Sequence, residues 1–334
     1  MNERELVARV RELFSARIGD DAAVIDGQVL TADMLVEDVD FTRAIPLRFI
    51  ARKALAVNLS DLAAMGAQPQ YALLSLALPP WAHEQADELL ASFAEMAKQY
   101  AIEIVGGDFS RAEKLTIAIT AIGRVVTRPL LRSGAKPGDR VYLSRPIGGS
   151  ATGLALLGNA GVLAGWTGAV SAPGGGTPPD QPPGRRRSYA EREFAESAIR
   201  RHVDPEPEVV LGVKLAQLEQ VTSCIDVSDG LSTDLHHLCD VSNWGAEIER
   251  ERIPIFPDLL TFGPRLGIRA SEAVLHGGEE YALLFTSSLR ESELSSKLGR
   301  PVYAIGRMTR ERNVVLKEDG IPRPLEPRGY DHFA

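Results

Sequence analysis

Three carboxylates embedded in apolar sequence place the strongest constraint on how this chain can fold. Asp33 lies in the strand-like run TADMLV, Asp61 in an Ala/Leu-rich stretch, and Asp226 in the run CIDVSDG. A carboxylate that is buried without a partner is costly, so each of these side chains needs hydrogen-bond donors or a cation. If several of them converge, they repel one another unless cations lie between them.

The oxygen atoms of these acids indicate a class of chemistry. Mg²⁺ prefers oxygen ligands and typically bridges a few carboxylates to substrate phosphates. The acids taken together therefore favour a Mg²⁺-dependent nucleotide or phosphoryl-transfer enzyme. For each acid taken alone, a strand end, a helix cap or a turn is the commoner explanation.

Further acids fit the same pattern. Asp20 and Asp21 stand side by side in IGDDAAVI, which is typical either of a solvated turn or of half a metal site. Asp108 follows a pair of glycines. Asp229 and Gly230 could simply begin the helix LSTDLHHL. At this level the sequence leaves both explanations open.

Other familiar active-site patterns are missing from the sequence. No G-x-x-x-x-G-K-[ST] loop occurs, and GGSATG (148–153) does not match the G-x-G-x-x-G fingerprint. There is no H-E-x-x-H motif and no G-x-S-x-G nucleophile elbow. His236 and His237 lie on a predicted helix, where we expect a structural or exposed role.

The composition excludes several other classes of protein. A length of 334 residues predicts two domains. The net charge of -8 argues against a nucleic-acid surface, because phosphate binding requires basic patches. The two cysteines provide neither a disulfide framework nor a zinc site, and we find neither a membrane span nor a signal-peptide core. We therefore expect a cytoplasmic protein with no nucleic-acid or membrane partner.

Alternating strand and helix patterns predict an α/β (α+β) fold. The predicted elements of the first part are strands at 29–36, 71–78 and 115–125 and helices at 47–69 and 83–100. Within the longer helix, Asn58 and Asp61 are one turn apart and share a face. The turn GAKPGDR (134–140) marks a junction, which gives domains at 1–137 and 138–334.

The second part continues the alternation around a compositionally biased segment. Its predicted elements are strand–turn–helix units at 141–158 and 221–240, a helix at 191–202 and strands at 277–286 and 301–309. The run APGGGTPPDQPPGRRR (172–187) is nearly all Gly, Pro and polar residues and cannot bury a core. It predicts a flexible Pro/Gly-rich insert near 159–190.

Eight segments between residues 18 and 333 follow the order found in one enzyme family: IGDDAAVI, ADMLVEDVDF, KALAVNLSDLAAMGAQP, GGDFSR, RSGAKPGD, IDVSDGLSTDL, HGGEEYALLF and GYDHF. In these segments the chain resembles the thiamine-monophosphate kinases. NLSDLAAMGA is shared in looser form with the wider aminoimidazole-ribonucleotide synthetase superfamily. The combination of RSGAKPGD with GYDHF points to the thiamine enzyme.

The resemblance implies a reaction and an architecture. ATP and thiamine monophosphate would give ADP and thiamine diphosphate, by direct in-line transfer supported by several Mg²⁺ ions. The acceptor phosphate oxygen is already ionised at neutral pH, so no general base is required. The family fold implies a homodimer in which the N-terminal sheets join into a barrel. A C-terminal α/β domain would pack against the N-terminal domain, with the site in the cleft between them.

The resemblance also implies roles for individual residues. The implied metal-binding positions are Asp21, Thr31, Ala32, Asp33, Asp61, Asp108, Asp226 and Asp229, and the transfer would be supported by Asp33, Asp108 and Asp226. The implied ATP-binding positions are Gly107, Asp108, Arg132 and Ser228. The implied positions for thiamine monophosphate are Asp40, Glu279 and Pro327. Asp21 is expected to face a metal shared with Asp61 and Asp226, whereas Asp20 shapes the turn that presents it.

Three of these positions depart from the family pattern. Ala32 stands where Thr is frequent, so a metal contact there would come from the backbone. Asp40 replaces a frequent His, and Pro327 replaces an aromatic residue that packs on the substrate. The latter two changes concern the recognition of the acceptor.

Two alternative functions remain to be weighed. The first is another ATP-using superfamily member: aminoimidazole-ribonucleotide synthetase, selenide water dikinase or a hydrogenase-maturation dehydratase. The dikinase would need a reactive Cys near the N-terminus, yet the first is Cys224, and the dehydratase would need a C-terminal Cys tail instead of GYDHFA. The second is a non-catalytic nucleotide-binding module, against which the intact acids argue.

Overall fold

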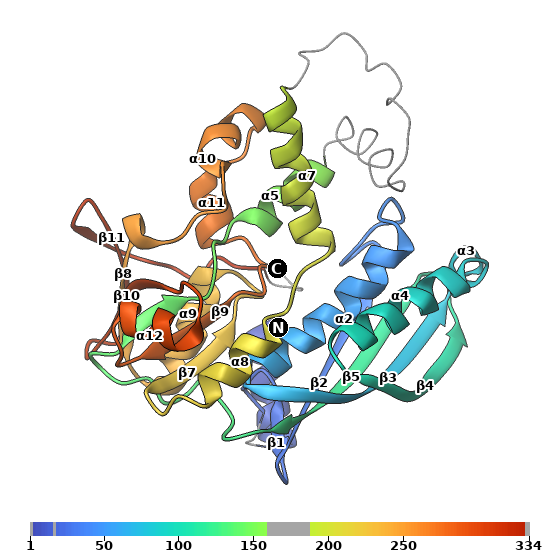
Figure 1. The fold of residues 1–334 in the computed structure, drawn as a ribbon, viewed down its shortest axis with the longest axis horizontal. Helices are drawn as coiled ribbons and strands as arrows, with labels where there is room; N and C mark the ends of the chain where they lie inside the picture. Colours follow the sequence, from blue (N-terminus) through green and yellow to red (C-terminus); the bar gives the residue numbers. More distant parts are fainter. Residues whose placement is uncertain (1–2, 16–17, 159–187, 331–334) are drawn as a thin grey trace.

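A computed structural model describes residues 3–15, 18–158 and 188–330 of the chain, and two mixed β-sheets organise it (Figure 1). The predicted α/β (α+β) class is confirmed, because helices pack on both sheets. Most of the predicted insert near 159–190 lies outside the described residues. Among the described residues, no helix is long and apolar enough to cross a membrane.

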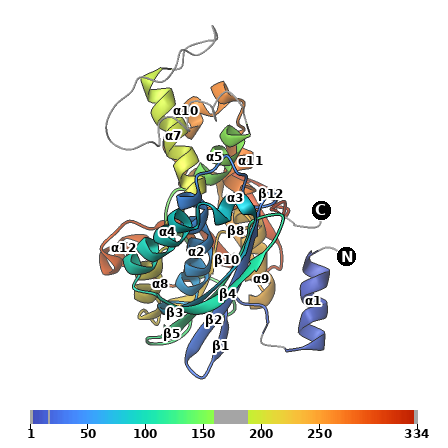
Figure 2. The same cartoon turned by 90° about the vertical axis from the view of Figure 1, so that its right-hand side faces the viewer.

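The first sheet has the strand order β1-β2-β5-β3-β4. Its strands are β1 (Ala23–Ile25), β2 (Gln28–Val36), β3 (Ala67–Leu78), β4 (Glu103–Arg111) and β5 (Thr116–Val125). The helices of this part are α1 (Glu3–Leu13), α2 (Leu47–Ala64), α3 (Pro80–His83) and α4 (Ala86–Gln99). Helices α2 and α4 cover one face of the sheet, as Figure 2 shows. On the opposite face Met34, Tyr71 and Leu73 are exposed.

The second sheet has the order β12-β11-β8-β10-β6-β9-β7. Its strands are β6 (Arg140–Leu143), β7 (Val221–Asp226), β8 (Gly245–Glu249), β9 (Leu283–Ser287), β10 (Tyr303–Thr309), β11 (Val314–Glu318) and β12 (Ile321–Pro324). The helices are α5 (Gly149–Leu157), α7 (Tyr189–Val203), α8 (Val209–Ala216), α9 (Leu231–Ser242), α10 (Leu259–Phe262), α11 (Ala270–Leu275) and α12 (Glu291–Leu298), with short 3₁₀ turns at Arg250–Arg252 and Pro264–Leu266. Tyr142 and Phe285 stack at the centre of this core.

Helix α2 is shared between the two parts of the molecule. It packs against β2, β3 and β5 on one side and against α8 and β7 on the other (Figure 1). Gly212 lets the backbone of α8 approach closely, because a Cβ there would lie 1.9 Å from the carbonyl oxygen of Ala63. Polar side chains on α2 therefore lie at the boundary between the two sheets.

The strands predicted at 29–36, 71–78 and 115–125 are confirmed, but two predicted boundaries are wrong. The helix predicted at 47–69 ends at Ala64, and Pro69 lies inside β3. Pro69 is tolerated because a register shift follows it and β4 pairs with β3 only from Tyr71 onward. The strand predicted at 277–286 begins only at Leu283, because the preceding segment takes positive φ angles at two residues.

Candidate active site

Four acidic side chains converge where α2 meets the second sheet. Asp21 precedes β1, Asp33 lies on the α2-facing side of β2, Asp61 lies on α2, and Asp226 ends β7. Ligand oxygens of Asp21, Asp61 and Asp226 all lie within 4.8 Å of one another. The fold thus brings together four of the predicted metal-binding positions from both parts of the chain.

The electrostatic cost of burying these carboxylates is only partly compensated. Burial, followed by the negative charges of Asp33, Asp226 and Asp21, raises the pKa of Asp61 well above its usual value. Burial, followed by the charge of Asp21, raises the pKa of Asp226 to about 7. Asp21 Oδ2 is buried and has no hydrogen-bond partner among the described residues. An all-oxygen donor set with an unsatisfied carboxylate oxygen fits a divalent cation such as Mg²⁺.

Three neutral side chains hold these acids in place. Thr31 Oγ1 donates to Asp61, and Ser60 Oγ donates to Asp226 Oδ2 across the boundary between the two sheets. Asn58 Oδ1 accepts a 3.2 Å hydrogen bond from the backbone N–H of Asp33. The helical spacing of Asn58 and Asp61 indicated their shared face, whereas sequence reasoning missed Ser60, because no local pattern reveals a contact made 166 residues away.

The adjacent acids Asp20 and Asp21 have different partners. Asp20 Oδ1 accepts a 2.7 Å hydrogen bond from the backbone N–H of Arg132, which fixes the segment between the two sheets. Asp21 Oδ1 forms a 2.6 Å ion pair with the guanidinium of Arg132, and its side chain is fully buried. Only Asp21 belongs to the convergent acids, whereas Asp20, which was expected to shape the turn beside it, contacts a backbone N–H 112 residues away.

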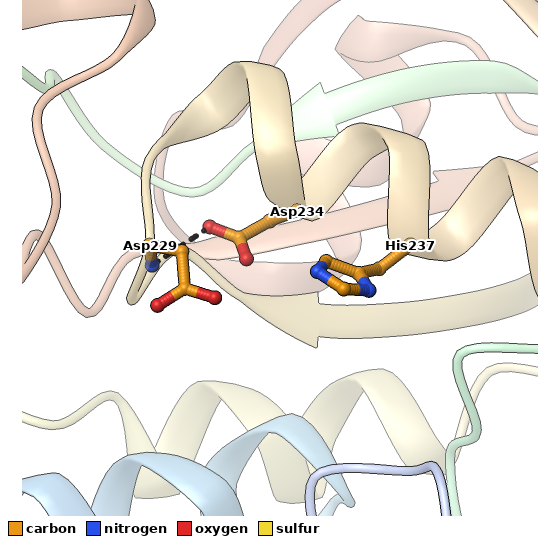
Figure 3. A group of neighbouring side chains, drawn as sticks. All are labelled: Asp229, Asp234 and His237. Carbon is orange, nitrogen blue, oxygen red and sulfur yellow. Dashed lines mark hydrogen bonds between the residues drawn. The ribbon is translucent and has the colours of Figure 1, made fainter. Parts of the chain in front are cut away.

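A second group of potential ligands lies at the N-terminus of α9. Ligand atoms of Asp229, Asp234 and His237 lie within 4.8 Å of one another (Figure 3). Asp234 Oδ2 accepts hydrogen bonds from the backbone N–H groups of Asp229, at 3.2 Å, and Gly230, at 3.0 Å. Burial, followed by the charges of Asp229 and Asp226, raises the pKa of Asp234 well above its usual value. Asp234 thus fixes the loop that carries Asp229 and Ser228, a role that no local sequence pattern indicated.

Gly107 and Asp108 do not join this cluster within one chain. Strand register aligns Asp108 with Ser75 of β3 and, through β5, with Met34 of β2. Directly opposed residues share a face, so Asp108 lies on the exposed face of the sheet, whereas Asp33 faces α2. The two acids are also separated by three strand spacings, roughly 14 Å. Ala32, adjacent to Asp33, has its side chain on the exposed face as well.

The predicted acceptor positions lie on both sides of the boundary. Glu279, from the segment before β9, forms an ion pair with Lys53 at 2.5 Å, and its carboxylate also lies 3.2 Å from His202 Nδ1. The carboxylate of Asp40 accepts a 2.7 Å hydrogen bond from the backbone N–H of Val36, so it closes its own turn.

The C-terminal segment of the described chain lies beside the same loop. Pro327 is half-buried, and Tyr330 N–H donates to the carbonyl oxygen of Asp229 at 3.2 Å. The backbone N–H of Gly329 donates to Thr233 Oγ1 at 2.8 Å. These contacts bring Gly329 and Tyr330, the first two residues of the ending GYDHF, against the start of α9.

The chain is similar to known proteins over nearly its full length. Family models described as the N-terminal and C-terminal domains of AIR synthase related protein match residues 19–125 and 136–319. The thiamine-monophosphate kinase of Escherichia coli strain K12 is 36% identical, covering 95% of this chain and 91% of the relative. That of Bacillus subtilis strain 168 is 35% identical, covering 95% and 93%.

Solved structures agree with these sequence matches. The thiamine monophosphate kinase of Aquifex aeolicus superposes with a TM-score of 0.79 at 27% identity, covering 98% of this chain and 100% of that one. A structure described as AaThiL complexed with AMPPCP and TMP gives a TM-score of 0.81 at 29% identity, covering 99% and 97%. The chain therefore belongs to the AIR synthase related family and, within it, to the thiamine-monophosphate kinases.

Proposed function

We propose that the chain transfers the γ-phosphoryl group of ATP to the phosphate of thiamine monophosphate, giving thiamine diphosphate and ADP. The observation that carries this proposal is the convergence of Asp21, Asp61 and Asp226 around an unsatisfied, buried carboxylate oxygen. Such a site requires a cation, and a cation among carboxylates is what binds the phosphates of a nucleotide. The family relationship supplies the identity of the acceptor.

Different residues of the chain would bind the metal, the nucleotide and the acceptor. Asp21, Asp33, Asp61 and Asp226 would hold Mg²⁺, with Asp229 at the start of α9 and the Thr31–Ala32 segment of β2 contributing from the sides. When bound, Mg²⁺ neutralises the charge that develops on the transferred phosphoryl group. Arg132 and Ser228 lie at the edge of the acids and would contact ATP. Asp40, Glu279 and Pro327 would orient the acceptor, whose ionised phosphate oxygen needs no general base.

We further propose that the active molecule is a homodimer in which Gly107 and Asp108 act on the partner's nucleotide. Within one chain Asp108 lies on the wrong face of the sheet for its own cluster. The same face carries the exposed side chains Met34, Tyr71 and Leu73, whose burial favours association, as the proposed barrel requires.

The assignment of Asp108 is tested by mixing two inactive variants in one dimer. Asp108→Asn and Asp61→Asn are each expected to lose nearly all activity alone. Co-expressed at equal levels, they form mixed dimers with one intact site, which restores about a quarter of wild-type activity if Asp108 acts across the interface. Purified mixed dimers without activity would contradict the assignment.

The reaction itself is tested by incubating the protein with ATP, Mg²⁺ and thiamine monophosphate and following thiamine diphosphate by chromatography. The Asp61→Asn variant serves as the control for contaminating kinases. Consumption of ATP with another acceptor, and no thiamine diphosphate, would refute the proposal.

We also propose a cytoplasmic location, which the low cysteine content supports. We further propose that the two domains divide at 137/138, between the end of β5 and the start of β6.

A further inference from the structure

A buried lysine joins the two halves of the proposed acceptor site. Lys53 lies on α2 with only 2% of its surface exposed. Its ammonium group lies 2.5 Å from Glu279 Oε1 and donates to the main-chain carbonyl oxygen of Asp40 at 3.4 Å. A buried ammonium group is stable only when it is paired, so Lys53 depends on these two partners. One side chain thus contacts both an N-terminal and a C-terminal residue that we assign to the acceptor.

Glu279 is constrained from several further directions. Its φ angle of 59° lies in the left-handed region, and its backbone N–H donates to the carbonyl oxygen of Ser228 at 2.6 Å. His202, at the end of α7, places Nδ1 3.2 Å from Glu279 Oε2 and 3.1 Å from Ser150 Oγ. Burial, followed by the charge of Lys53, lowers the pKa of His202 well below its usual value, so the imidazole is neutral. A strained backbone that is held by this many groups is typical of a functional site.

We propose that Lys53 is a positioning residue for thiamine monophosphate, acting through Glu279, and that His202 supports it from the other carboxylate oxygen. Because Lys53 belongs to α2 and Glu279 to the C-terminal part, the pair sets the distance between the two surfaces that hold the acceptor. This inference rests on the proposed function, since it concerns the acceptor of that reaction. The side chain of Glu279 remains 31% exposed, so the acceptor can reach it while Lys53 stays covered.

The neighbouring residue of α2 provides a matched control. Arg52 forms a 2.6 Å ion pair with Asp204, which is also part of the C-terminal half, and both side chains are largely buried. Arg52→Met therefore removes an ion pair between the same two parts of the molecule without touching Glu279. If Lys53 served only to hold the halves together, Lys53→Met and Arg52→Met would have similar kinetic effects.

The test is steady-state kinetics of Lys53→Met, Arg52→Met, Glu279→Gln and the double variant Lys53→Met/Glu279→Gln. We expect Lys53→Met to raise the KM for thiamine monophosphate by about tenfold, the typical effect of losing a charged hydrogen bond. The KM for ATP should change by less than about threefold, and Arg52→Met should leave both constants near wild type. The double variant should be no worse than Glu279→Gln by more than about twofold, because the two residues act as a unit.

Each outcome decides a separate point. No thiamine diphosphate from the wild type would refute the proposed function and this inference together. An active wild type with an unchanged acceptor KM in Lys53→Met, or with additive effects in the double variant, would overturn the positioning role alone.

If Lys53→Met fails to fold, the proposal is tested by comparing the acceptor KM of two His202 variants. His202→Gln presents an amide N–H donor to Glu279 and should retain an acceptor KM close to wild type. His202→Leu lacks the donor and should raise that KM. Equal acceptor KM values in the two variants would overturn the proposal.

Discussion

Replacing Asp226 by asparagine should make the metal-free protein more stable while abolishing its activity. The pKa of Asp226 is raised from 3.8 to about 7, chiefly by burial. Each pKa unit corresponds to about 1.4 kcal/mol, so the ionised carboxylate costs the folded state about 4 kcal/mol. An amide keeps an acceptor for Ser60 and adds an N–H donor near the unpartnered Asp21 Oδ2. We expect a net gain of about 2 to 4 kcal/mol at pH 8, since the amide is itself costly to bury.

The sign of the pH dependence follows from the raised pKa. Below pH 3.8 the carboxyl group is protonated in both the folded and the unfolded chain, and the cost is absent. The cost grows as the pH rises from 3.8 to about 7 and is complete above that. At pH 5 only a minor part of this cost is present, so the advantage of Asp226→Asn should fall to less than half of its value at pH 8.

Thermal unfolding in EDTA, followed by circular dichroism at pH 5 and pH 8, measures this effect. At pH 8 the gain corresponds to roughly 4 to 8 °C in the unfolding midpoint. The control is Asp139→Asn, because Asp139 is a buried acid outside the cluster whose carboxylate accepts from Lys136 N–H and Thr222 Oγ1. That change should lower the midpoint. An Asp226→Asn midpoint at or below wild type at pH 8, or an equal gain at both pH values, would refute the reasoning.

Three further predictions concern the metal, the nucleotide and the interface. Mg²⁺ at about a hundred times its dissociation constant should stabilise the wild type by about 2.7 kcal/mol. The stabilisation should be larger at pH 8 than at pH 5, because the carboxylate ligands must be deprotonated to bind the ion. An unfolding midpoint that does not respond to Mg²⁺ would contradict the cation site. Asp108→Asn should lower kcat by on the order of a hundredfold with an unchanged unfolding midpoint, and wild-type turnover would show that Asp108 is misassigned. Leu73→Glu should convert a dimer into monomers in sedimentation equilibrium, and an unaltered mass would exclude the exposed sheet face from the interface.

The sequence predicted the elements that carry the acids better than it predicted the contacts around them. Asp33 in a strand and Asp61 in a helix follow from local hydrophobic patterns, and the structure confirms both placements. Ser60, Lys53 and His202 escaped notice because their partners lie in the other half of the chain. Local propensity does not encode contacts between residues so distant in sequence.

The segment 277–282 was predicted to be part of a strand for a related reason. It was taken together with the apolar run that follows it, but Glu279 and Tyr281 adopt positive φ angles that only the surrounding structure can enforce. The sequence also did not predict that Asp108 lies on the exposed face of its sheet. Alternation along a strand decides which face a residue occupies, and strand β4 was not predicted. Local rules therefore failed at proposed site residues.

Helix α2 also determines how the chain can be made and divided. It is completed early in synthesis, yet one of its sides is covered only when α8 and β7 have emerged from the ribosome. Until then Ser60 and the apolar residues beside it remain in water, so the N-terminal half cannot reach its final stability alone. A fragment ending near residue 137 should therefore aggregate or stay partly unfolded, although it contains a complete sheet. The helix that carries Asp61 into the acid cluster is also the element that makes the two halves one folding unit.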